Sequence, residues 1–160
     1  MAGRKVTLPL FILLFSASIT FGQTEVLKSV VNNLAFYKQK KDLKYLSSAK
    51  KSVDSVIVTR KDSADLEKNV YKAVVYSSIV YIDSLNSLKM PADFFDKTRR
   101  HLDNLMTNKK SYKFQSEIDY CRRCIANIYL RQGFGYMHNS DYNNAIQIFR
   151  KAKKYAPEFK

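Results

Sequence analysis

Cys121 and Cys124 are the residues of this 160-residue chain whose type and spacing could most readily do chemistry. Two residues separate them, a spacing at which two thiols can form a disulfide or act as a redox pair. Redox pairs of this kind normally lie at the start of a helix, where the helix dipole stabilises a thiolate. Here they fall inside a predicted helix, on an apolar stripe with Ile118, Ile125 and Ile128, so we expect them to pack as small apolar residues. A disulfide between Cys121 and Cys124 is the alternative.

Other residue types give little support for catalysis or metal binding. The two histidines, His101 and His138, lie in no local metal or nucleophile motif, and the chain has no glycine-rich phosphate loop. The cysteine pair lacks a second pair of ligands at matching spacing. His101 follows Arg99 and Arg100 and is expected at the surface. We therefore predict a noncatalytic protein with no cofactor and no metal.

The helices that carry these residues can be predicted from apolar periodicity, most clearly near the C-terminal end. Tyr129, Gly133 and Tyr136 recur at i, i+4 and i+7, which is one face of a helix. A following helix has its own stripe, formed by Tyr142, Ala145, Phe149 and Ala152. Ser140 or Asp141 can cap this second helix, and the short polar break between the two helices predicts that they fold back antiparallel.

Gly133 needs a physical reason, because glycine inside a helix costs about 1 kcal/mol relative to alanine. Close approach of the two helices, with Ala145 as the small residue opposite, supplies that reason. Pro157 cannot continue a helix and ends the unit. With these residues, the segment 126–159 resembles the tetratricopeptide repeat family, which uses small and aromatic residues at this spacing in a helical hairpin. Gln132 departs from the family pattern, which usually has an aliphatic residue there.

A single repeat cannot bury its own apolar faces, so about three are expected in a stable stack. Further stripes upstream predict helices over about 43–56, 64–87, 91–106 and 112–138, with a polar loop from Thr59 to Ser63 and a cap at Asp62 or Ser63. We therefore predict an all-α fold. The resemblance implies a short right-handed solenoid of helical hairpins, with about six helices in a single domain over 23–160.

The resemblance also implies a binding groove. In tetratricopeptide arrays the first helix of each hairpin lines the concave surface, which here would carry Asn127, Leu130, Phe134, Met137 and His138. The apolar members favour an apolar peptide or helix as ligand, with Asn127 supplying a polar contact. The lysine and asparagine set with which some family members bind a C-terminal carboxylate is missing. The alternative is that neighbouring helices of the same chain cover these side chains.

The N-terminal residues have the layout of a signal peptide. Arg4 and Lys5 precede an uncharged run over 6–24, and Gly22 is an acceptable cleavage point. We therefore predict that residues 1–22 are removed and that the product is periplasmic or secreted, with no stable membrane span. The alternative is an uncleaved segment that anchors the chain, since the run is nearly long enough to cross a bilayer.

The chain is strongly basic, with a formal net charge of +14. Arg4 and Lys5 would leave with the signal peptide, so the product would carry +12. This charge favours anionic partners such as acidic proteins, lipid head groups or glycans, while export argues against nucleic acid. Individual basic clusters, such as Arg150, Lys151 and Lys154, are more simply explained as the solvated faces of helices.

Together these features predict an exported scaffold or adaptor that binds a protein or peptide partner within an envelope complex. The partner would lie in the groove or against the edge of the last hairpin, where a second copy could also dock. The edge is predicted to be uncovered because few residues follow Pro157. The alternative function is a basic envelope protein that binds polyanions through its cationic surface.

Overall fold

Every regular element within residues 27–156, the part of the chain that the computed structural model describes, is helical. The elements are a helix over 27–40, α2 (Lys44–Ser55), α3 (Arg60–Ala64), α4 (Leu66–Ile82), α5 (Phe94–Thr107), the 3-10 helix η1 (Lys109–Phe114), α6 (Gln115–His138) and α7 (Tyr142–Tyr155). The predicted all-α fold of helical hairpins is confirmed. The predicted signal peptide and Pro157 lie outside the described residues.

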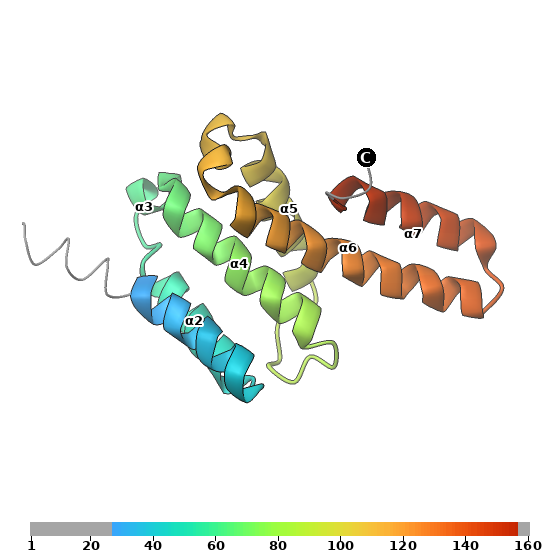
Figure 1. Ribbon diagram of the computed structural model, residues 1–160, viewed down its shortest axis with the longest axis horizontal. Helices are drawn as coiled ribbons and strands as arrows, with labels where there is room; N and C mark the ends of the chain where they lie inside the picture. The colour runs from blue at the N-terminus through green and yellow to red at the C-terminus, as the bar shows by residue number, and fades with distance from the viewer. Residues whose placement is uncertain (1–26, 157–160) are drawn as a thin grey trace, which may run out of the picture.

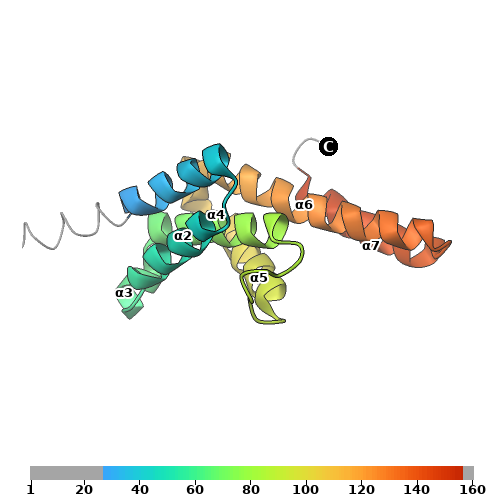
Figure 2. The ribbon, with the colours of Figure 1, turned by 90° about the horizontal axis from the view of Figure 1, so that it is seen from below.

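Consecutive helices pair as hairpins, and the hairpins stack along the molecule (Figure 1). The helix over 27–40 packs on α2, α4 packs on α5, and α6 packs on α7. Between hairpins, α4 contacts α2 on one side and α6 on the other, and α6 also touches α5. Viewed from below, the helix over 27–40 and α6 lie on one side of the molecule, while α3 and α5 lie on the other (Figure 2).

Two apolar clusters hold the stack together, and α4 contributes to both. The first joins the helix over 27–40 and α2 to α4 and the start of α5 through buried residues that include Val30, Leu46, Val75 and Ile79. The second joins α4, α5, α6 and α7 through residues that include Val70, Leu102, Ile125 and Tyr155. Burial of aliphatic and aromatic side chains on both sides of α4 makes that helix the centre of the domain.

Local hydrogen bonds set helix boundaries that periodicity placed only approximately. The predicted cap of α4 at Asp62 or Ser63 is wrong, because both residues lie in α3 and the Asp65 side chain accepts the bond from Lys68 N at 3.1 Å. Asp62 instead pairs with the buried Lys68 ammonium, which holds the pKa of that carboxyl well below its usual range. At the other end, α4 stops at Ile82 because Asp83 accepts bonds from the backbone of the following loop.

The last hairpin follows the prediction in its cap and its buried alanines, but Tyr136, expected on the apolar face with Tyr129 and Gly133, is 38% exposed. Asp141 caps α7 as predicted, accepting from Asn144 N, and Ala145 and Ala152 are buried. Gly133 does allow a close approach, but the group against it is the Phe149 ring rather than Ala145. Tyr142 was expected on the buried stripe and is instead 60% exposed.

A polar network centred on Asp103 ties the end of this hairpin to α5. The Tyr155 hydroxyl donates to Asp103 Oδ1 at 2.7 Å, and Lys154 Nζ donates to the same oxygen at 3.1 Å. Arg99 Nη1 donates to Asp103 Oδ2 at 3.1 Å. The C-terminal end of α7 is thereby fixed on the body of the domain, while the turn between α6 and α7 projects away from it (Figure 1).

His101 lies between two helices rather than at the surface as expected. It is partly buried, and its Nε2–H donates to the Asn69 carbonyl of α4 at 2.9 Å. Burial lowers the pKa of His101. The imidazole therefore joins α5 to α4 in its neutral form.

Alanine substitution at the two glycines of α6 should have opposite effects. A Cβ at Gly133 would overlap the Phe149 ring, so Gly133→Ala should lower the free energy of unfolding by about 1–3 kcal/mol. Gly135 has nothing within 4 Å of that position, so Gly135→Ala should raise it by about 0.5–1 kcal/mol. Urea unfolding of both variants measures the difference, and equal effects would contradict the close packing at Gly133.

Acid should weaken the contact between α5 and α4 through His101. Because the folded pKa lies below the unfolded value of about 6.5, the stability that this group contributes is complete above pH 6.5 and is lost as the pH falls through the folded pKa. Urea unfolding between about pH 7 and pH 5 should show a smaller loss of stability in His101→Gln than in the unchanged protein. The same slope in both proteins would show that His101 is not the titrating group.

Candidate partner-binding surface

The five residues predicted to line a groove lie along the part of α6 that projects from the body of the domain. Asn127, Phe134, Met137 and His138 are exposed, and only Leu130 is partly buried. Phe134 is 59% exposed and Met137 is 42% exposed. The alternative that neighbouring helices cover these side chains is therefore wrong for four of the five. The Asn127 amide donates to the Arg123 carbonyl of its own helix at 2.9 Å.

Helix α7 adds apolar residues to this surface that the sequence prediction did not include. Ile146 is 51% exposed, and it lies on the same side of α7 as the exposed Tyr142 and the partly buried Phe149. The Phe149 ring contacts the Phe134 ring edge-on, with 5.4 Å between ring centres. We call the surface formed by Phe134, Met137, Tyr142, Ile146 and Phe149 the end face. The i, i+4, i+7 spacing of Tyr142, Ile146 and Phe149 is a signal that could have identified it.

The face of α6 that carries Phe134 corresponds to a face of α4, and that face of α4 is buried. Sixty positions before Leu130, Phe134 and Met137, α4 has Val70, Val74 and Ser77. Val70 and Ser77 are fully buried, and Val70 and Val74 belong to the cluster that joins α4 to α6. On α4 this face is covered by the next hairpin, whereas on α6 no described residue covers it. The end face is thus a helix-stacking surface without a helix on it.

A basic pocket lies on another part of the surface, between the helix over 27–40, α4 and α6. Its volume is about 290 Å³, and its lining includes Tyr37, Lys38 and Lys41. At its floor the Tyr120 and Ser78 hydroxyls share a hydrogen bond of 2.9 Å. Among the described residues, no carboxylate lies within ion-pair distance of Lys38 or Lys41. This pocket could hold an anionic group.

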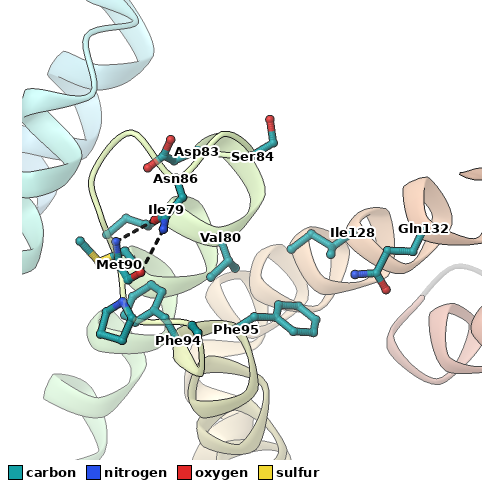
Figure 3. Close-up of a pocket in the computed structure, with 12 residues that line it drawn as sticks. Ile79, Val80, Asp83, Ser84, Asn86, Met90, Phe94, Phe95, Ile128 and Gln132 are labelled. Atoms are coloured by element: carbon teal, nitrogen blue, oxygen red, sulfur yellow. Dashed lines mark hydrogen bonds between the residues drawn. The ribbon is translucent and has the colours of Figure 1, made fainter.

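A second cavity, of about 300 Å³, lies between the end of α4, the loop that follows it, α5 and α6 (Figure 3). Val80, Phe95 and Ile128 form much of its apolar wall, and Gln132 lies at its edge. The Asn86 side chain makes two hydrogen bonds to the backbone of Met90, which closes the loop. The cavity lies where Gln132 replaces the expected aliphatic residue, so we interpret it as incomplete packing rather than as a binding site.

Positive charge is concentrated beside the end face. Arg150 and Lys153 are exposed on α7. With Ile146 they occupy positions i, i+4 and i+7, so the three lie on one side of the helix. Asp141 is the one acidic residue in the sequence over 127–156, and its two carboxylate oxygens accept bonds from Asn144. The apolar end face near the turn is therefore bordered by a basic area nearer the body, formed by Arg150 and Lys153.

The two cysteines are buried inside the domain. Cys121 and Cys124 are free thiols in this structure, and both are buried on the side of α6 that faces α4. Burial raises the pKa of Cys121 to about 12 and that of Cys124 to about 11, so neither forms a thiolate readily near neutral pH. Their positions fit the predicted packing role. No cluster of His, Cys, Asp or Glu side chains within residues 27–156 is arranged to bind a metal ion.

Comparison with protein-family models, with characterised proteins and with solved structures finds no match to this chain. The resemblance to tetratricopeptide repeats therefore stays a prediction from the sequence, while the stack of helical hairpins is a property of the structure itself. Within residues 27–156, none of the helices combines the length and apolar character needed to cross a membrane.

The buried thiols should react slowly in the folded protein. At pH 8 in a non-denaturing buffer, a thiol reagent such as 5,5′-dithiobis(2-nitrobenzoate) should label Cys121 and Cys124 at a rate limited by opening of the structure. In concentrated urea, where the chain is unfolded, the reagent should label both cysteines quickly. This control shows that the thiols have not been oxidised. Rapid labelling of the folded chain, or no free thiol in urea, would contradict the packing role.

Proposed function

We propose that this chain is a noncatalytic protein-interaction module whose end face binds a helical segment of a partner protein. The observation that carries the proposal is the exposure on α6 of Phe134 and Met137, whose counterparts on α4 lie beneath the next hairpin. Contiguous apolar surface of this kind commonly marks an interaction site. A groove between two antiparallel helices can bind a third helix through its apolar face.

The rest of the domain supports a role as a scaffold. The two buried clusters and the Asp103 network fix the last hairpin on the body, so its end face is presented on regular helices rather than on loops. Surfaces held in this way bind with a small loss of conformational entropy. In keeping with the sequence prediction, we propose that the chain belongs with the tetratricopeptide-like proteins. We also propose that it is exported and serves as a scaffold or adaptor in an envelope complex.

Binding of polyanions through the cationic surface is the second candidate function. The observation that favours it is the pocket with Lys38 and Lys41, together with the exposed Arg150 and Lys153 on α7. Exposed charges of this kind attract glycans, lipid head groups or acidic proteins, but the attraction is screened by salt. The two candidates therefore differ in how binding responds to salt and to loss of apolar side chains.

Affinity capture from the native envelope, followed by mass spectrometry, can distinguish them. A partner of the end face should survive a wash with a few hundred millimolar salt and should be reduced about five- to thirtyfold by Phe134→Ala or Ile146→Ala. Leu85→Ala is the matched control, because Leu85 is 88% exposed in the loop after α4. Ligands that are lost in salt and captured equally by all three variants would contradict the proposal and favour polyanion binding.

A further inference from the structure

We propose that the occupant of the end face is an acidic amphipathic helix that lies parallel to α6. Its first turns would carry Asp or Glu facing Arg150 and Lys153, and its later turns would carry apolar residues facing Phe134, Met137 and Ile146. This inference rests on the proposed function and names the class of partner. It follows from the packing of the preceding hairpin and from the uneven distribution of charge on α7.

The preceding hairpin shows how a helix occupies such a groove. Helix α6 contacts both α4 and α5, and it runs in the same direction as α4 (Figure 1). A helix placed in the same way on the last hairpin would contact α6 through Phe134 and Met137 and α7 through Tyr142 and Ile146. These four side chains are between 42% and 60% exposed, so they are free to make those contacts.

The charge on α7 defines which end of the groove is basic. Arg150 and Lys153 follow Ile146 on one side of the helix, toward the end that the Asp103 network holds against α5. Among the described residues, no carboxylate lies within ion-pair distance of Arg150 or Lys153. The apolar residues Tyr142 and Ile146 lie toward the turn. An occupant must therefore be acidic at one end and apolar at the other.

The direction of the occupant follows from this pattern. Because α7 runs antiparallel to α6, its C-terminal end lies beside an earlier part of α6. A helix parallel to α6 would therefore begin near Arg150 and Lys153 and end near the turn. Acidic residues in the first turns of a helix also interact favourably with its own dipole. The same residues would thus stabilise the partner helix and pair with α7.

A second copy of the chain fits this surface poorly. The end face of each copy is flanked by the basic Arg150 and Lys153, and the one acid in the sequence over 127–156, Asp141, is already bonded to Asn144. The whole chain carries a formal charge of +14, so repulsion acts over the wider surface as well. Charge complementarity therefore selects an acidic partner over self-association.

Three fluorescent peptides of equal length and apolar content test the inference by anisotropy with the full chain at moderate salt. One has Glu in its first two turns and Leu at i, i+4 and i+7 afterwards; the second has the two halves exchanged; the third has Lys in place of Glu. The first peptide should bind about tenfold more tightly than either of the others.

Arg150→Glu combined with Lys153→Glu should weaken binding of the first peptide about tenfold and strengthen binding of the third. Lys109→Glu combined with Lys110→Glu, on the exposed part of η1, is the matched control and should leave the preference for the first peptide unchanged.

The outcomes separate this inference from the proposed function. Equal binding of all three peptides, with loss in Ile146→Ala, would overturn the acidic and parallel occupant while the proposed function stands. Tighter binding of the exchanged peptide would overturn the orientation. Failure of every peptide to bind would count against both proposals. A photocrosslinker at position 146 that joins two copies, or that joins the chain to its own residues 1–26, would show a different occupant and overturn the inference.

Discussion

The packing of α6 against α4 is the contact on which the rest of the structure depends. Two helices alone leave most of their apolar side chains in water, so a hairpin in this domain is stable only when another hairpin covers one of its faces. Small side chains allow the approach, with Ala73 and Ser78 on α4 and Cys121 and Cys124 on α6 all buried. The Tyr120 hydroxyl, bonded to Ser78, closes the same interface with its polar group satisfied. The two cysteines, at a spacing typical of redox pairs, thus lie in this interface as small buried residues.

The same rule accounts for the exposed apolar surface of the last hairpin. Helix α4 has an apolar neighbour on each side, and its side chains are buried accordingly in two clusters. Helix α6 packs against α4 on one side and against α7 on an adjacent side. Its remaining apolar side chains, Phe134 and Met137, stay in contact with solvent. Phe134 still packs its ring against Phe149 within the hairpin, so the exposed surface is the part of this apolar face that α7 leaves uncovered.

The fold was largely predictable because the helical stripes are strong and local. Gly133, Asp141 and the alanines of α7 act through neighbours within the same hairpin, so their roles could be inferred from spacing alone, apart from the identity of the group against Gly133. Two features were missed for different reasons. His101 is partly buried because it reaches the Asn69 carbonyl on another helix. Asp62 belongs to the capping box of the short helix α3 and pairs with Lys68, and the apolar periodicity does not show that α3 is separate from α4. The Tyr142 side chain could not be placed because its periodicity fits either side of α7, and only the position of α6 decides between them. Of the α6 residues predicted to line a groove, Phe134 and Met137 are exposed, whereas the exposure of Tyr142 and Ile146 on α7 was not predicted.

The central claim is that an apolar face buried on α4 is exposed on α6 and α7, and solvent accessibility of methyl groups measures this directly. In a methyl-labelled sample, a soluble paramagnetic probe should broaden the NMR signals of the Met137 and Ile146 methyl groups strongly. It should leave the signals of Val70 and Ala152 nearly unchanged, because those side chains are 0% and 3% exposed. Equal protection of all four residues would contradict the account, since it would show that the end face is covered in the free protein.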